Sequence, residues 1–241
     1  SDRSGGIPYT MKVINPEQLL IAVEYLQQGK TIIFPTETSY GLGCDAANQD
    51  AVNKIFKIKG RQSDKPLLVV MPTVEMAKKY LVWNDLLEDL SKKYWPGPLT
   101  VVGEYLSLRG ALSDEAIPKF GSASEGIAAL PAVARNDSLA FGVVSPSNTI
   151  AVRVTNHPVL KFLSEKLGRP VVATSANLAG AGDIYDSKKI IEKPSFATSI
   201  GGAMPDILID GGVLPQNPPT TIVSVVESKI KILRQGQLRI I

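Results

Sequence analysis

The chain has 241 residues, enough for one large domain or two small ones at ~150 residues each. Its 44% hydrophobic and 20% charged residues are typical of a globular protein and exclude a disordered or collagen-like chain. A single cysteine, Cys44, and a single histidine, His157, exclude intrachain disulfides, multi-thiolate sites and two-histidine metal sites. The formal net charge of +3 is too small to indicate a nucleic-acid coat protein.

The sequence gives no reason to expect a membrane protein. No stretch approaches the ~18 consecutive apolar residues of a membrane-spanning helix. Residues 1–6 are polar and lack the apolar segment of a signal peptide. We therefore expect residues 1–10 to be disordered or derived from a tag, and the protein to be cytoplasmic.

Periodicity and capping residues predict the elements of the first half. Asn15 and Gln18 form a candidate capping box, and Thr73 and Asn84 are candidate N-caps of two later helices. The predicted order is a strand at 11–14, a helix from Asn15 to Gly29, a strand at 31–35, a loop at 36–43, a helix at 49–58, a strand at 67–71, helices at 74–81 and 85–94, and a strand at 99–102.

The second half is richer in strands. Asn156 is the candidate cap of a helix that stops at Gly168. The predicted order is a strand at 149–154, a helix at 158–167, a strand at 170–174, a short helix at 187–192, and strands at 207–210, 221–226 and 229–233. Because these strands cluster, the pattern favours an α+β fold with a mixed sheet over a purely parallel one.

Residues 103–148 interrupt this pattern. They are rich in Ala, Ser and Gly, have weak periodicity and are mildly acidic. Long segments without a clear pattern are usually functional lids or disordered. We expect an insert here that acts as a lid or as a partner surface.

Two cations flank a glycine just after the second helix, Lys59 and Arg61. Such a pair can grip a polyphosphate, since Arg offers a two-pronged donor and Lys a point charge. The alternative is a solvated helix end whose positive charges favour the C-terminal dipole. From the residues alone, both interpretations stay open.

Hydroxyl groups and small residues gather in two further places. The loop at 36–43 carries Thr36, Thr38 and Ser39, and its glycines permit close approach to a ligand or simply form a turn. Ser175 and Asn177 directly follow a buried strand, where they could bind a ligand or form a turn.

Arg153 is a charged residue among apolar neighbours, so it either faces solvent or meets a carboxylate in a cavity. His157 precedes a helix and is interpreted as structural, and Cys44 as a small core residue. No general base and no nucleophile–histidine pair is visible. The residues suit the binding and orientation of a charged small molecule, such as a nucleotide with an amino acid.

Eight motifs occur together in one order: FPTETSYGLG at 34–43, KGR at 59–61, KPL at 65–67, WPGPLT at 95–100, AVRV at 151–154, TSAN at 174–177, IDGG at 209–212 and ILR at 232–234. This set resembles the YrdC-like family of threonylcarbamoyl-AMP synthases, over about residues 15–102 and 149–236. The resemblance implies a twisted mixed sheet with surrounding helices and a large basic concave cavity. It also implies the short, single-domain type, spanning 11–241 with an atypical insert at about 103–148.

The resemblance implies an activity as well. The protein would make L-threonylcarbamoyladenylate and pyrophosphate from L-threonine, bicarbonate or CO2, and ATP. Mg²⁺ would be held mainly through the ATP phosphates, with no dedicated metal site in the protein. The product would pass to a downstream complex that modifies tRNA, and the resemblance allows weak tRNA binding.

Residue roles carry over motif by motif. Those expected to hold the ATP phosphates, and counted as catalytic, are Lys59, Arg61, Ser175 and Asn177. Further nucleotide contacts are expected from Lys65, Thr149, Asp183 and Arg234. Threonine contacts are expected from Thr38, Arg153, Ala173 and Thr220. Lys65 and Val70 stand where some two-domain relatives have asparagine and histidine.

Two other functions compete with the synthase. A nonenzymatic RNA-binding module would use the basic cavity and would show strongly salt-dependent RNA affinity without ATP turnover. The small net charge and the acidic insert argue against it. A related carbamoyl-adenylate enzyme of hydrogenase maturation usually carries zinc-finger parts, for which one cysteine is too few.

Overall fold

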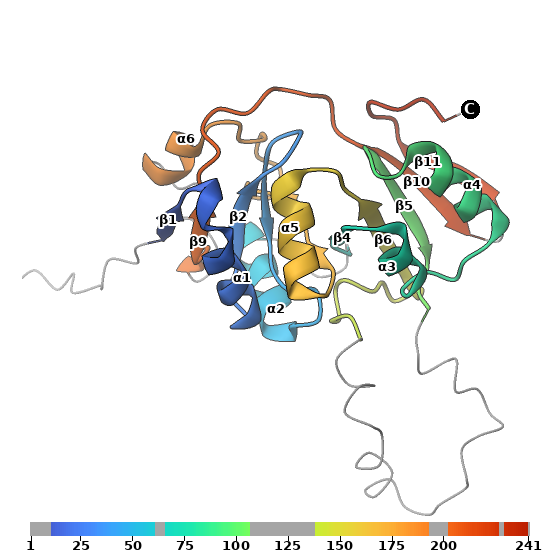
Figure 1. Cartoon of the computed structure of the whole chain (residues 1–241), viewed down its shortest axis with the longest axis horizontal. Helices are drawn as coiled ribbons and strands as arrows, with labels where there is room; N and C mark the ends of the chain where they lie inside the picture. Colours follow the sequence, from blue (N-terminus) through green and yellow to red (C-terminus); the bar gives the residue numbers. More distant parts are fainter. Residues whose placement is uncertain (1–10, 61–65, 107–137, 193–201, 227–228, 241) are drawn as a thin grey trace, which may run out of the picture.

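The computed structural model describes residues 11–60, 66–106, 138–192, 202–226 and 229–240 (Figure 1). Its strands form two mixed sheets. The five-stranded sheet has the order β1-β9-β2-β3-β8, and the six-stranded sheet the order β11-β10-β5-β6-β4-β7. Each combines parallel and antiparallel pairs, as the α+β prediction requires.

The elements up to residue 104 follow the prediction closely. The capping box forms, with Asn15 N–H donating to Gln18 Oε1 at 3.1 Å, but the first turn it caps is a 3₁₀ turn. The elements are β1 (Lys12–Ile14), η1 (Pro16–Gln18), α1 (Leu19–Gln27), β2 (Ile32–Pro35), β3 (Tyr40–Gly43), α2 (Gln49–Lys59), β4 (Leu68–Met71), α3 (Val74–Lys78), α4 (Asp85–Tyr94) and β5 (Leu99–Glu104).

The later elements also match in order. Gly168 ends α5 in the left-handed conformation, as expected of a glycine C-cap. The elements are β6 (Thr149–Val154), α5 (Pro158–Leu167), β7 (Val171–Val172), β8 (Thr174–Ser175), α6 (Ser187–Glu192), β9 (Ile207–Ile209), β10 (Thr221–Val226) and β11 (Lys229–Arg234).

Helices cover both faces of the sheets, so central strands are buried on both sides. Along β2, Ile32 and Phe34 pack with α1 and α5, whereas Ile33 packs into the larger cluster on the other face. This alternation follows from the two-residue period of a strand. Figure 1 shows α1 and α5 side by side across the front of the sheets. The hydrophobic core thus keeps the strands in place, including the strand ends that border the candidate active site.

Several sequence predictions were wrong in detail. Residues 40–43 are not loop but β3, which pairs antiparallel with β2. The third helix is shorter than predicted, since α3 ends at Lys78. The N-cap of α5 is His157, not Asn156.

The strand predicted at 170–174 is divided between the two sheets. β7 pairs with β4 in one sheet, and β8 pairs with β3 in the other. Ala173 lies at the crossing point, where its N–H donates to Leu68 O at 2.9 Å. The crossing keeps both sheets close together beside the site.

The predicted insert falls largely outside the described residues, which stop at 106 and resume at 138. The flanks are placed: Gly103 and Glu104 belong to β5, and Asn148 bonds to the backbone of Tyr105. The N-terminal segment 1–10 also lies outside the described residues.

Candidate active site

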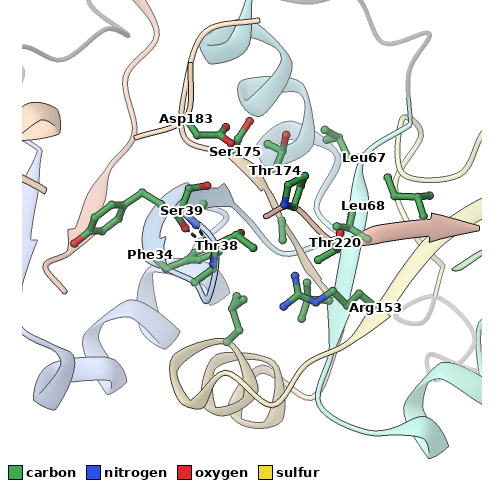
Figure 2. A pocket seen from close by; sticks show the side chains of 18 of the residues that line it. Phe34, Thr38, Ser39, Leu67, Leu68, Arg153, Thr174, Ser175, Asp183 and Thr220 are labelled. Atoms are coloured by element: carbon green, nitrogen blue, oxygen red, sulfur yellow. Dashed lines mark hydrogen bonds between the residues drawn. The ribbon is translucent and has the colours of Figure 1, made fainter. Parts of the chain in front are cut away.

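A cavity of about 390 Å³ opens where the two sheets meet (Figure 2). Its polar wall draws on loops and strands that are far apart in the sequence. Apolar side chains, including Phe34, Leu68 and Leu160, complete the lining. The polar and charged lining residues are Thr36, Thr38, Ser39, Tyr40, Arg153, Thr174, Ser175, Asp183, Thr220 and Arg234.

Arg153 is the buried cation of this cavity. It projects from β6, next to Val70 of the paired strand β4, and only 5% of its surface is exposed. Figure 2 shows its side chain reaching toward the loop that carries Thr38. Burial lowers the pKa of Arg153 to about 10, so the guanidinium remains charged at neutral pH. The cavity therefore holds a desolvated positive charge suited to a carboxylate or a phosphate.

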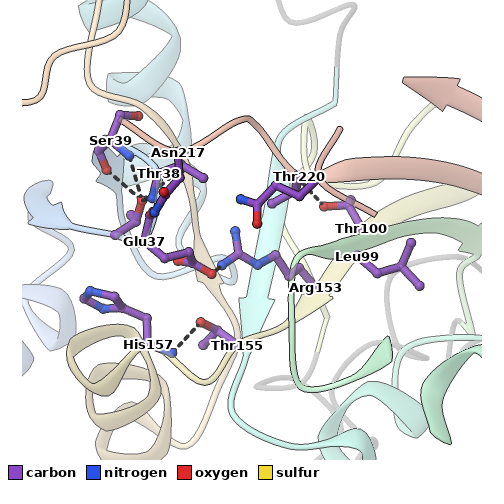
Figure 3. A network of polar contacts seen from close by, with 12 residues as sticks. Glu37, Thr38, Ser39, Leu99, Thr100, Arg153, Thr155, His157, Asn217 and Thr220 are labelled. Carbon is purple, nitrogen blue, oxygen red and sulfur yellow. Dashed lines mark hydrogen bonds and ion pairs between the residues drawn. The ribbon is translucent and has the colours of Figure 1, made fainter. Parts of the chain in front are cut away.

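Glu37 neutralises that charge from the β2–β3 loop. Its Oε1 forms an ion pair with Arg153 Nη2, drawn in Figure 3. The sequence analysis missed this contact, although Glu37 stands in the middle of the hydroxyl-rich motif. Its carbonyl oxygen accepts a bond from Asn217 Nδ2 at 2.7 Å.

His157 lies behind Arg153, at the start of α5. Burial, and secondarily the Arg153 cation, lower the pKa of His157 to about 4. Its backbone N–H donates to Thr155 Oγ1 at 3.0 Å. A neutral imidazole in this place is consistent with the structural role expected from the sequence.

The loop at 36–39 is held by its own hydroxyls. Thr36 Oγ1 donates to Ser39 O at 2.7 Å and accepts the N–H groups of Thr38 and Ser39. Tyr40, which follows this loop, is anchored because its hydroxyl donates to Gly212 O and accepts from Gly211 N–H. These bonds fix the position from which Thr38 faces the cavity.

Ser175 and Asn177 form a tight turn after β8. Ser175 Oγ donates to Asn177 Oδ1 at 2.7 Å, and Asn177 Nδ2 donates to Ala181 O at 2.6 Å. Lys59 lies beneath this turn, only 3% exposed. Its Nζ donates to Ser175 O at 2.7 Å, Asn177 O at 3.0 Å and Asn177 Oδ1 at 3.1 Å. Lys59 thus fastens α2 to the turn.

Arg234 and Thr220, which both line the cavity, are hydrogen-bonded to each other. Arg234 Nη2 donates to the carbonyl oxygen of Thr220 at 2.9 Å and to its Oγ1 at 3.1 Å. Burial lowers the pKa of Arg234, and the charge of Asp183 acts in the opposite direction. A second cation therefore lines the cavity besides Arg153.

The structure brings together most of the residues named from the sequence. Those that line the cavity are Thr38, Arg153, Ala173, Ser175, Asp183, Thr220 and Arg234. Lys59 and Asn177 support the wall from behind and are not among its lining residues. Thr149 begins β6, where its N–H donates to Ser145 Oγ at 3.0 Å, and it does not line the cavity either. Arg61 and Lys65 lie outside the described residues.

The part of the chain that the structure describes has neither a metal-ligand cluster nor a membrane-spanning helix. Among the described residues, no three His, Cys, Asp or Glu side chains gather in a group that could hold a metal ion. Within those residues, no helix has the length and apolar character needed to cross a membrane.

Comparison with known proteins identifies the family. The family model Sua5/YciO/YrdC, described as telomere recombination, matches residues 24–236. The chain belongs to this family. A member from Pyrococcus abyssi named threonylcarbamoyl-AMP synthase is 30% identical over 224 residues, which is 92% of this chain but 54% of that protein. A member of the same name from Vibrio vulnificus strain YJ016 is 29% identical over 217 residues, covering 89% of this chain and 96% of that protein.

Solved structures of family members share the fold. P. abyssi Sua5 complexed with L-threonine has a TM-score of 0.69 and 27% identity, covering 95% of this chain and 58% of that one. Escherichia coli YciO has a TM-score of 0.68 and 21% identity, covering 95% and 96%. The chain therefore spans between half and three fifths of the P. abyssi protein, and nearly all of YciO.

Proposed function

We propose that this protein makes L-threonylcarbamoyladenylate and pyrophosphate from L-threonine, bicarbonate or CO2, and ATP. The observation that carries the proposal is the buried Arg153 guanidinium, which faces a cavity lined by hydroxyl groups and by a second arginine, Arg234. The P. abyssi relative solved with L-threonine supports an amino acid in such a cavity. The names of the curated relatives support the reaction.

Two halves of the cavity would divide the substrates. Arg153 would bind the threonine carboxylate, with Thr38, Ala173 and Thr220 around the rest of the amino acid. Ser175, Asp183 and Arg234 would face the nucleotide, together with Arg61 and Lys65 from the adjoining segment. Lys59 and Asn177 would act by holding the Ser175 turn rather than by touching phosphate, given their contacts.

The chemistry needs positioning more than proton transfer. The unprotonated amine of threonine adds to CO2 and gives up one proton to solvent, or adds to bicarbonate with loss of water, and either route gives a carbamate. A carbamate oxygen then attacks the α-phosphate of ATP in line. Pyrophosphate leaves with its electron pair. Fixed cations lower the barrier where negative charge accumulates, and holding the reactants together removes much of the entropic cost. The proposal sends the protons released from the amine to solvent and assigns no side chain as general base, and the half-buried His157, with its pKa near 4, is a weak base.

Mg²⁺ belongs to the proposal as the companion of the ATP phosphates. Mg²⁺ is usually bound through phosphates and one or two carboxylates, with water completing the octahedron. Asp183 is the one carboxylate among the described lining residues, which fits that arrangement. The cation would neutralise phosphate charge.

The proposal extends to the context of the reaction. Its product would be consumed by a threonylcarbamoyl-transferring complex that modifies tRNA, in the cytoplasm where ATP, bicarbonate and tRNA are found together. Weak tRNA binding would be compatible with the basic cavity.

The test measures pyrophosphate released from ATP with each substrate omitted in turn. The proposal predicts release that requires both L-threonine and bicarbonate. Tight, salt-dependent RNA binding with no threonine-dependent release would contradict it and favour the RNA-binding alternative.

A further inference from the structure

The ion pair between Arg153 and Glu37 is unequal in its access to water. The Arg153 side chain is 6% exposed, whereas that of Glu37 is 24% exposed. Glu37 is not among the residues that line the cavity, but Arg153 is. Part of the Glu37 side chain therefore lies at the surface, although its Oε2 atom is buried, whereas the Arg153 side chain borders the cavity.

The pair also leaves hydrogen-bonding capacity unused. Glu37 Oε2 and Arg153 Nε are buried, and neither has a hydrogen-bond partner among the described residues. A guanidinium and a carboxylate reach full strength when two N–H groups meet two oxygens. Buried polar atoms without partners cost free energy, so this pair is weaker than the one a well-oriented carboxylate could form.

Charge balance favours a ligand carboxylate that replaces Glu37 over one that binds beside it. A ligand carboxylate that binds Arg153 beside Glu37 would place two negative charges around one buried positive charge. If the ligand replaces Glu37, the buried site stays neutral, because one carboxylate leaves for solvent as another arrives. Like charges in a desolvated site repel strongly, so replacement is the less costly route.

The loop backbone does not have to move for this exchange. Asn217 holds the carbonyl group of Glu37, and Thr36 ties its own loop to Ser39. Figure 3 shows the Glu37 side chain extending from this anchored backbone to Arg153. Rotation of the side chain alone would release the guanidinium.

We propose that Glu37 is a specificity-determining residue: it is the resident counter-ion of Arg153, and only a ligand that brings its own carboxylate displaces it. The inference rests on the proposed function for the identity of that ligand, L-threonine. An uncharged or purely cationic ligand gains nothing from the exchange, because it would leave Arg153 buried without a counter-ion.

The expected change in threonine affinity follows from the fraction of molecules in which the Glu37–Arg153 ion pair is formed. If Glu37 occupies Arg153 in about nine tenths of the molecules, the apparent affinity for threonine is reduced about tenfold. Glu37→Gln removes the competing charge and nearly keeps the shape of the side chain. We therefore expect it to tighten L-threonine binding by roughly three- to tenfold.

The test is calorimetric titration of L-threonine and of L-threoninamide, which lacks the carboxylate, into the full chain. Glu192→Gln, on an exposed position of α6, is the matched control. We expect tighter threonine binding only in Glu37→Gln, with no gain for the amide in any variant. Unchanged or weaker threonine binding in Glu37→Gln, or an equal gain for the amide, would overturn the exchange while leaving the proposed function intact. If neither wild type nor variant bound threonine, the proposed substrate itself would fail, and the exchange with it.

A second measurement does not depend on the variant folding. The structure of the wild-type protein with bound L-threonine should show Glu37 Oε1 more than ~4 Å from Arg153 Nη2, beyond ion-pair distance. A threonine carboxylate on Arg153 with Glu37 still in contact would overturn the exchange.

Discussion

Lys59 offers the sharpest stability prediction, because its ammonium group is buried and donates to three oxygen atoms of one turn. Lys59→Met removes these three bonds; Asn177 O loses this donor, whereas Ser175 O and Asn177 Oδ1 each keep one, from Asn177 N–H and Ser175 Oγ. Each of the three lost bonds to the charged donor contributes ~1 kcal/mol or more, which gives about 3 kcal/mol in total. Relief from burying the ammonium charge offsets part of this, so we expect a net loss of about 2 kcal/mol. For a chain of this size, that lowers Tm by roughly 4–8 °C.

The assay compares thermal and urea unfolding of wild type, Lys59→Met and Lys57→Met. Lys57 lies on the same helix with its side chain in solvent, so its loss should leave the free energy of unfolding nearly unchanged. Threonine-dependent pyrophosphate release should also fall in Lys59→Met, because the turn at Ser175 and Asn177 loses its order. An unchanged Tm combined with a large loss of ATP affinity would refute the reasoning, since it would mean that Lys59 reaches the phosphates directly.

Three further predictions concern the cavity and the strands around it. Arg153→Lys should raise KM for L-threonine by about 10–100-fold and leave KM for ATP nearly unchanged, because lysine cannot make a bidentate contact with the threonine carboxylate. Equal effects on the KM of both substrates in steady-state kinetics would contradict this. The imidazole of His157, the one histidine of the chain, should titrate near pH 4 by NMR. Because this pKa lies below the value of 6.5 expected in the unfolded chain, the contribution of His157 to the free energy of unfolding should be complete above about pH 6.5 and decline toward pH 4. His157→Gln should flatten that decline. Gly43→Ala should cost more than about 3 kcal/mol, because its Cβ would lie 1.9 Å from Val172 O, whereas Gly182→Ala, which meets open space, should stay within about 0.5 kcal/mol in urea unfolding.

Helices were predictable where their signals are local. Thr73 and Asn84 cap their helices through bonds to N–H groups three residues ahead, and such bonds can be inferred from spacing alone. The strand β3 was missed because its glycines suggest a loop. Their lack of a side chain is instead required by packing, since a Cβ on Gly41 would meet the ring of Phe34 at 2.4 Å. That requirement depends on a partner strand, which local patterns do not reveal.

The candidate site shows the same contrast between what local sequence signals predict and what depends on long-range contacts. Residues recognised by motif, such as Arg153 and Thr220, do line the cavity. The contacts that decide their behaviour are long-range, and no spacing rule predicts them. Glu37 meets an arginine more than a hundred positions away, and Lys54 on α2 pairs with Asp206 at 2.6 Å. The motif predicts that Lys59 contacts phosphate, but it does not reveal the turn that the Lys59 side chain supports.

The central claim is that this cavity joins threonine, bicarbonate and ATP into one molecule. The most direct measurement is mass spectrometry of a reaction containing isotopically labelled bicarbonate, L-threonine and ATP. We predict an adenylate that carries both the threonine and the labelled carbon, formed by wild type and strongly reduced in Arg153→Lys. Pyrophosphate or AMP formed without any labelled threonyl adenylate would contradict the claim.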